Sequence, residues 1–195
     1  MSDDLKLFIT VFLGSGASFA LLNFFAQFWK DRRQRQHVAL RVAFHLEAYA
    51  IQCEKIHSDH EMHKASGGGA GVAITEIPQL APYPAEDQFR LLHPQTVDRL
   101  YALPQECQIA QRAVEHIWEF VDDDAASEAA ADGAIVMGDN ALQVARSIRR
   151  QYNLEPRQLQ FNDWSVEEYF EKELNAILQR KQAKESQMKT TAQTV

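Results

Sequence analysis

The sequence predicts an all-α protein, in which a single N-terminal transmembrane helix continues into a cytoplasmic bundle of about four helices. Residues 7–29 carry no formal charge and are mostly apolar. In the remainder, apolar residues recur at spacings of three and four, which is the period of an amphipathic helix. The pieces that could form strands, VAIT and GAIVM, are short. These three observations favour helices throughout.

The composition is that of a folded chain with room for one ordinary domain and an anchor. The chain has 195 residues, of which 46% are hydrophobic, with 8 Gly and 6 Pro. These values exclude a collagen-like, Pro-rich or wholly disordered protein. The formal net charge of -7 argues against nucleic acid as a partner.

Residues 7–29 form the predicted transmembrane span. As a helix the segment reaches about 34 Å, whereas a hydrocarbon core is about 30 Å thick. A cleaved signal peptide is one alternative, but the chain starts with Asp3 and Asp4 instead of basic residues. A buried core helix is another, and it would need apolar partners on every side. Residues 1–6 are then a short extracytoplasmic tail.

The charges beside the span predict its direction. Residues 30–41 form a basic juxtamembrane collar, whereas acidic residues outnumber basic ones before the span. Because Lys and Arg are retained on the cytoplasmic side, we expect the N-terminus outside and the C-terminal domain in the cytoplasm, at an inner or plasma membrane. The collar either sets this topology alone or also contacts anionic lipid headgroups. Its candidate residues are Lys30, Arg32, Arg33 and Arg35.

A stripe of small and amide side chains runs along one face of the span. Gly16, Ala20, Asn23 and Gln27 follow one another at spacings of 4, 3 and 4. Small residues allow close helix approach, and amides in hydrocarbon seek hydrogen-bond partners, so this face predicts a homo-oligomer or pairing with another membrane protein. The alternative is that Gln27 lies near the headgroups and that one Asn is tolerated.

Periodicity divides residues 42–183 into the helices of the bundle. The first helix continues from the span to about Lys64, and a Gly/Pro-rich loop at 65–87 follows, part of which is expected to drape over the body. The second begins near Pro94, the third covers about 125–152, and the fourth begins at Ser165 with a capping box. Residues 184–195 have the composition of a disordered tail.

Each helix has an apolar stripe that is expected to face the core. These residues are Val38, Val42, Phe44, Leu46, Tyr49, Ile51, Cys53 and Ile56 in the first helix, Val97, Leu100, Tyr101, Ile109, Ala113, Ile117, Phe120 and Val121 in the second, Met137, Ala141, Val144, Ala145, Ile148 and Tyr152 in the third, and Val166, Phe170, Leu174, Ile177 and Leu178 in the fourth. Packing these stripes together gives a helical bundle.

A Glu/His pattern offers a candidate metal site. Glu54 and His57 have the Glu-x-x-His spacing of di-iron carboxylate bundles, and His116 and Glu119 offer the reversed order on another helix. A di-metal centre also needs further inward carboxylates, which the apolar stripes do not supply. The alternative is that the histidines from His57 onward form a solvated helix end, and we expect no resident metal or other cofactor.

His45 and the two cysteines are the other candidate reactive groups. His45 lies beside the apolar seam, where it could accept a phosphoryl group or make only a local hydrogen bond. Cys53 and Cys107 are too few for a disulfide framework and are expected to be free thiols. Cys107 lies near the predicted start of a helix, which would lower its pKa, although no base accompanies it.

Together these observations predict a membrane-anchored protein with a non-enzymatic interaction or scaffolding role at the cytoplasmic face. Its expected partners are membrane lipid and a protein. A metal-binding bundle is the first alternative, and a phosphorelay or sensory component acting through His45 is the second.

Overall fold

The structure, a computed structural model, describes residues 16–193 of the chain. The elements are α2 (Gly16–Ala65), η1 (Glu86–Leu91), α3 (Pro94–Phe120), α4 (Asp123–Gln151), β1 (Gln160–Phe161), β2 (Trp164–Ser165) and α5 (Val166–Gln193). Helix dominates, and each strand has two residues, so the predicted all-α class is confirmed. The predicted tail at 1–6 and residues 7–15 of the predicted span lie outside the described residues.

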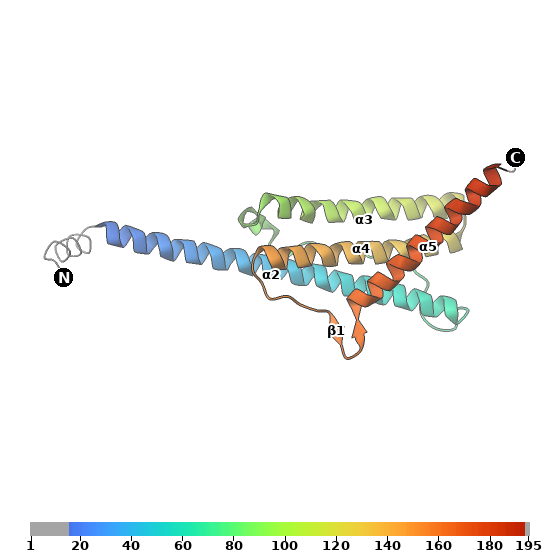
Figure 1. The fold of residues 1–195 in the computed structure, drawn as a ribbon, viewed down its shortest axis with the longest axis horizontal. Helices are drawn as coiled ribbons and strands as arrows, with labels where there is room; N and C mark the ends of the chain where they lie inside the picture. Colours follow the sequence, from blue (N-terminus) through green and yellow to red (C-terminus); the bar gives the residue numbers. More distant parts are fainter. Residues whose placement is uncertain (1–15, 194–195) are drawn as a thin grey trace.

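The first helix, α2, is much longer than the bundle to which it belongs. Its first part projects from the body as a single rod, and its second part lies alongside α3 and α4 (Figure 1). The chain between Ala17 and Ser66 contains neither Gly nor Pro, which allows an uninterrupted helix. The helix ends at Ala65, as predicted, because Gly67 and Gly68 then adopt positive φ angles.

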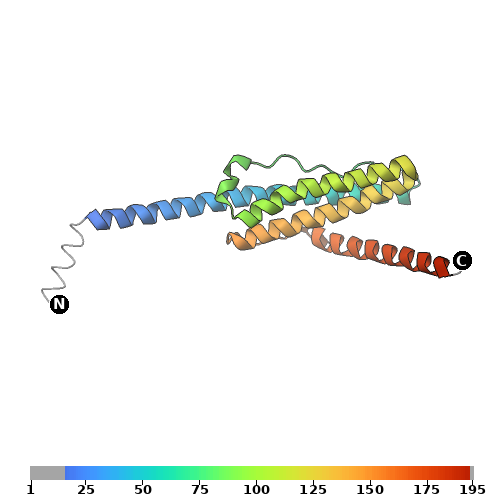
Figure 2. The same cartoon turned by 90° about the horizontal axis from the view of Figure 1, so that it is seen from above.

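Gly71 explains how the chain turns back onto α2. Its φ is +74°, and a Cβ atom there would lie 2.2 Å from the carbonyl oxygen of Asp59. Only glycine allows this close approach. The following segment then runs back along the bundle in extended form, as predicted (Figure 2). Three side chains of this segment, Ile74, Ile77 and Tyr83, are buried, so the segment contributes to the core.

The helix α4 is the centre of the body, because α2 and α3 both pack against it. Its N-cap is Asp122, whose carboxylate accepts a hydrogen bond from the amide of Ala125 at 2.6 Å. Small side chains on its buried surface let the neighbouring helices approach closely. These buried residues are Ala126, Ala130, Ala131, Ala134, Ala141 and Ala145.

The predicted core stripes are confirmed on α4 and only in part elsewhere. On α2, Phe44 and Ile51 are exposed, while Glu47 and His57 are buried. On α3, the predicted residues Tyr101, Ile109, Ala113, Phe120 and Val121 are exposed, because the helix is rotated to bury Leu100, Leu103, Cys107 and Val114. Leu178 on α5 is also exposed. The rotation of a helix follows from its neighbours, which periodicity alone does not specify.

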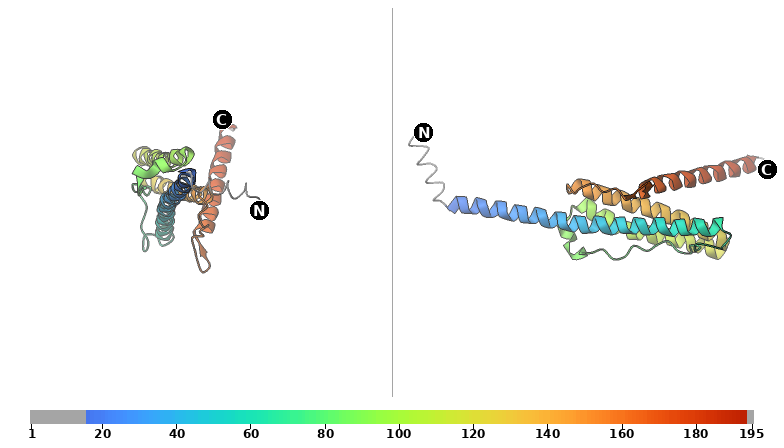
Figure 3. Two further views of the ribbon diagram at one scale, coloured as in Figure 1. Left: turned by 90° about the vertical axis from the view of Figure 1, so that its left-hand side faces the viewer. Right: turned by 90° about the horizontal axis from the view of Figure 1, so that it is seen from below.

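The fourth helix of the predicted bundle, α5, crosses the other three and diverges from them (Figure 3). The hairpin formed by β1 and β2 precedes it, with Phe161 opposite Trp164. The Ser165 half of the predicted capping box is present, since the amide of Glu168 donates to the hydroxyl of Ser165 at 3.3 Å. The helix continues to Gln193, past the predicted start of the disordered tail at residue 184, and the disorder of that tail stays a prediction.

Candidate functional site

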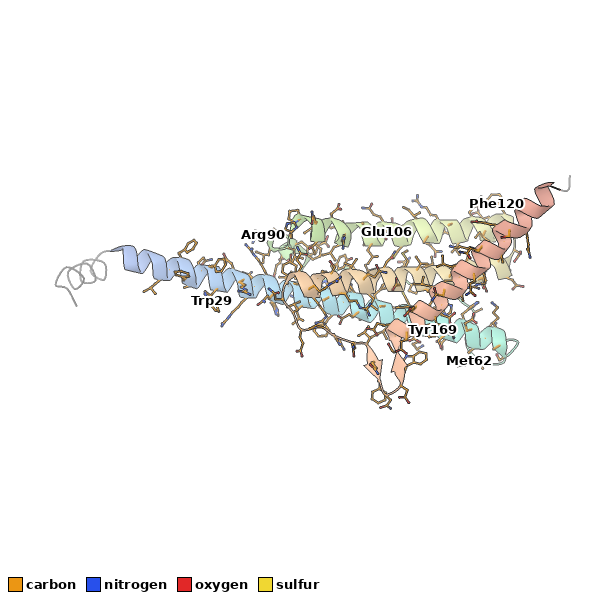
Figure 4. All side chains as sticks on the ribbon, viewed as in Figure 1. Trp29, Met62, Arg90, Glu106, Phe120 and Tyr169 are labelled. Atoms are coloured by element: carbon orange, nitrogen blue, oxygen red, sulfur yellow. The ribbon has the colours of Figure 1, made fainter. Side chains whose placement is uncertain are left out.

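The projecting part of α2 exposes a group of large apolar side chains. No other described element covers this segment, which points away from the body, and Figure 4 shows Trp29 on it. The exposed fractions lie between 56% and 68% for Leu22, Phe24, Phe25, Phe28 and Trp29. Monomeric soluble proteins rarely leave such contiguous apolar surface uncovered.

Residues 16–193 contain no helix with both the length and the apolar character needed to cross a membrane. The predicted span begins at residue 7, so its first part is outside that range.

The predicted association face lies on the same projecting segment. Gly16, Ala20, Asn23 and Gln27 all belong to α2, and the last two are exposed. The Gln27 side chain donates a hydrogen bond to Asp31 at 3.0 Å. This amide therefore has a local partner one turn away. Association through this face stays a prediction.

A hollow with a basic lining lies where α2 leaves the body. It has a volume of about 530 Å³ and is bordered by residues of α2, η1 and the adjoining ends of α3 and α4. Arg32 and Arg35 line it from α2, and Arg90 lines it from η1. Figure 4 shows Arg90 at the end of the bundle from which α2 projects. We call this feature the basic hollow.

Hydrogen bonds hold the elements around the basic hollow together. The Gln36 side chain donates to the carbonyl oxygen of Tyr152 at 3.0 Å, which joins α2 to the end of α4. The amide of His93 donates to the Tyr152 hydroxyl at 2.7 Å, which joins the start of α3 to the same point. The hollow is therefore a preformed feature of the junction.

Sequence reasoning found only part of the basic hollow. Arg32 and Arg35 belong to the predicted collar, whereas Arg90 and His93 follow more than fifty residues later in an unremarkable stretch. Lys30 and Arg33 are not among the lining residues. Arg90 lies beside the collar only because the loop returns to the base of α2. No sequence pattern near Arg90 predicts this position.

The proposed metal site is not formed in the structure. Residues 16–193 contain no group of three His, Cys, Asp or Glu side chains that could hold a metal ion, so Glu54, His57, His116 and Glu119 do not converge. His57 Nδ1 lies 2.7 Å from the Tyr169 hydroxyl, and the His116 ring packs against Phe120. The two halves of the motif lie on α2 and α3, each of which packs mainly against α4.

His57 is buried and not part of a solvated helix end. Burial lowers its pKa, although the nearby Glu173 and Glu61 act in the opposite direction. The low pKa and the Tyr169 partner favour a neutral ring that connects α2 to α5. His60 is also buried; its Nδ1 accepts a hydrogen bond from the amide of Ile74 at 3.3 Å. These histidines have structural partners.

The other candidate reactive groups also have structural partners. His45 Nε2 lies 2.9 Å from the carbonyl oxygen of Ala81 in the returning loop. Cys53 and Cys107 are free and buried, and the Tyr49 hydroxyl is 3.3 Å from the sulfur of Cys107. Burial raises the pKa of Cys53 to about 12 and also raises that of Cys107. The expectation of a low pKa at Cys107 is wrong, because this residue lies inside α3 and not at its start.

A buried ion pair, which the sequence analysis did not predict, connects α2 to the end of α4. The Arg149 guanidinium donates to both carboxylate oxygens of Glu47, at 2.5 and 3.0 Å, and both side chains are buried. Arg157 donates to the same carboxylate at 3.0 Å from the loop after α4. Both guanidinium groups lie about 5 Å from the ring of Phe44. The cluster therefore neutralises Glu47 from two directions.

Two surface features thus remain without a structural partner among the described residues, namely the apolar projecting segment and the basic hollow at its base. Both lie at the same end of the body (Figure 4). No protein-family model matches the chain, and no curated protein or solved structure is similar to it.

Proposed function

We propose that this protein is a single-pass membrane protein whose N-terminal helix crosses the bilayer and holds the helical body at the cytoplasmic face, where the body has a non-enzymatic interaction role. The observation that carries this proposal is the exposed apolar segment of α2, which projects alone from the body and is followed directly by basic residues. Its neighbours in the sequence, residues 7–15, extend the same apolar run.

Energetics support lipid as the cover of the projecting segment. Burying a large apolar side chain stabilises it by about 1.5–3 kcal/mol relative to exposure in water. Several such side chains lie within residues 22–29, so leaving them in water is strongly unfavourable. Hydrocarbon surrounds a helix on all sides, as this segment requires, whereas a groove on a protein would cover one face.

The collar supports the proposed direction. Lys30, Arg32, Arg33 and Arg35 follow the apolar segment immediately and are opposed in that stretch only by Asp31. Basic residues at the end of a span are retained in the cytoplasm, so the body lies on that side. The acidic remainder of the chain is repelled by an anionic leaflet and is held near it only at the base of α2.

An exposed apolar face of α3 supports the interaction role. Ile109, Phe120 and Val121 have exposed fractions of 65% or more, although the helical pattern marks them as core residues. Acidic side chains follow at 122–124, so the surface suits a protein partner that presents apolar side chains beside basic ones. Figure 4 places Phe120 at the end of the body opposite to Trp29, where the membrane does not hinder a partner.

Alkaline carbonate extraction of membranes tests the anchor. We expect the full chain to stay in the membrane fraction, and Phe19→Asp combined with Leu22→Asp to release most of it. Each Asp near the centre of a span opposes insertion by about 2.5–3.5 kcal/mol. The matched control, Val72→Asp with Phe161→Asp, adds the same two charges at exposed positions of the body and should stay membrane-bound.

Release of the unmodified chain by carbonate contradicts the anchor. The direction has its own readout, since a reporter fused after Val195 that is active only when exported should be silent. An active reporter would place the body outside and overturn the cytoplasmic assignment while leaving the anchor intact.

Site-specific photocrosslinking in native membranes tests the interaction face. A photoreactive residue at Ile109 or Phe120 should give the same protein adduct, because both side chains lie on the exposed face of α3. The control position is Phe161 on the hairpin, which is 78% exposed and should not give this adduct. An adduct formed equally from all three positions, or from none of them, contradicts a docking role for α3.

A further inference from the structure

We propose that the basic hollow binds the phosphate group of one anionic phospholipid in the cytoplasmic leaflet. This inference rests on the proposed membrane anchor and names a specific lipid partner for it. It goes further than a diffuse attraction between a basic collar and the membrane, because a residue of the body, Arg90, lines the same hollow as two residues of the collar.

The charge of the hollow is opposite to that of the chain. The protein carries a net charge of -7, yet none of the described residues that line the hollow is acidic, and Arg32, Arg35 and Arg90 all line it. Within residues 16–193, no hydrogen bond or ion pair engages these guanidinium groups. By contrast, Arg149 and Arg180 are paired with carboxylates. Unpaired arginines that converge on one cavity favour an anion as its occupant.

The chemistry of the donors suits a phosphate. Guanidinium groups present paired N–H donors that match phosphate oxygens, and they keep their charge at any physiological pH. The backbone at the start of α3 offers few hydrogen-bond donors to an anion. Pro94 has no amide hydrogen, and the amide of Gln95 already donates to the His93 ring at 3.3 Å. The arginine side chains are therefore the donors available to an anion.

The position of the hollow suits a lipid. Phe28 lies at its rim on the exposed apolar segment, and Arg35 follows two helical turns later, about 10 Å along the axis. The headgroup region on each side of a hydrocarbon core is about 5–8 Å thick. If the apolar segment is in hydrocarbon, Arg32, about 6 Å beyond Phe28 along the axis, lies at the depth of the phosphates. The backbone of Arg35 lies just beyond that depth, and its long side chain can extend back toward the phosphates. The volume of about 530 Å³ accommodates a headgroup.

A free phosphate ester offers the same chemistry, but the rim favours the lipid. Apolar side chains of Phe28, Leu91 and Leu92 border the hollow beside the arginines. A soluble anion gains nothing from these contacts, whereas the glycerol and first acyl carbons of a phospholipid are covered by them. The anchor also keeps the hollow at the leaflet surface, where lipid is the most concentrated phosphate.

Native mass spectrometry of the full chain in an uncharged detergent measures this binding. We expect one phosphatidylglycerol to be retained per chain, and phosphatidylcholine to be retained at least about tenfold more weakly because its choline offsets the phosphate charge. Arg90→Gln should weaken phosphatidylglycerol binding by about tenfold or more. Arg90 is exposed and outside the predicted span, so this variant should remain folded and carbonate-resistant.

The matched control is Arg33→Gln, which removes an equal charge from the collar at a residue that does not line the hollow. Its effect should be less than about fivefold, as for a charge that acts only at long range. Equal weakening by both variants indicates diffuse attraction and overturns the site. If glycerol 3-phosphate binds the hollow as tightly as phosphatidylglycerol does, the site is one for a soluble phosphate ester and the proposal of a lipid ligand is overturned.

The failure of this inference is distinguishable from that of the anchor. A chain that resists carbonate extraction but retains no phosphatidylglycerol overturns the headgroup site alone. A chain that carbonate releases overturns the proposed function, whatever lipid it retains in detergent.

Discussion

Replacing Glu47 with leucine is expected to lower the free energy of unfolding by about 3–5 kcal/mol. The substitution leaves the buried Arg149 guanidinium without the carboxylate that accepts two of its hydrogen bonds. An unpaired charge that remains in a low-dielectric interior is far more costly than the intact pair. Arg157 is about half exposed and regains water, so most of the loss comes from Arg149.

Urea unfolding of the full chain in detergent, followed by helical circular dichroism, measures this loss. The matched control is Glu61→Leu, at an exposed carboxylate whose nearest cation, Lys64, is 4.0 Å away. That substitution should change stability by less than about 1 kcal/mol. The double variant Glu47→Leu with Arg149→Leu should regain most of the loss, since it removes both buried charges. A single Glu47→Leu variant as stable as the control would refute the ion pair as a structural element.

Replacing Phe170 with alanine is expected to lower the free energy of unfolding by about 3–5 kcal/mol. Phe170 is fully buried where α5 crosses the body. Its ring packs so closely on α4 that a Cβ atom on Gly138 would lie 2.6 Å from it and 2.8 Å from the Cβ atom of Cys53. The neighbouring backbones cannot close the resulting cavity without moving a whole helix.

The same urea titration measures the effect of Phe170→Ala. Phe161→Ala removes an identical side chain from an exposed position on the hairpin and should change stability by less than about 0.5 kcal/mol. Equal effects of the two variants would contradict the packing of α5 against α4. Because Phe170 is fully buried where α5 meets the body, hydrogen exchange in α5 should also accelerate in Phe170→Ala.

The helices themselves could be predicted well from the sequence, because their signals are local. The end of α2 at the glycine run, the start of α3 at Pro94 and the cap that Ser165 provides to α5 depend on residues within a few positions of one another. The hairpin and η1 were missed, because each is too short to have a periodic pattern.

The candidate site was predicted only where it consists of consecutive residues. The apolar segment and the collar can be recognised because membrane insertion responds to composition along the chain. The basic hollow could not be recognised, since Arg90 joins Arg32 and Arg35 only after the loop has returned along the bundle. The Glu/His spacing gave a wrong prediction of a metal site for the same reason. It shows which residues share one face of a helix, but it does not show which faces of different helices pack together.

Local chemistry therefore determined the helical class, the main helix boundaries and the contrast between an apolar segment and a basic collar. Tertiary structure alone decided that Ile109 and Phe120 face outward, that Glu47 meets Arg149, and that three arginines line one hollow. Periodicity states only that a helix has an apolar side. The rotation and partner of that side depend on contacts between residues far apart in the chain, which carry no local signature.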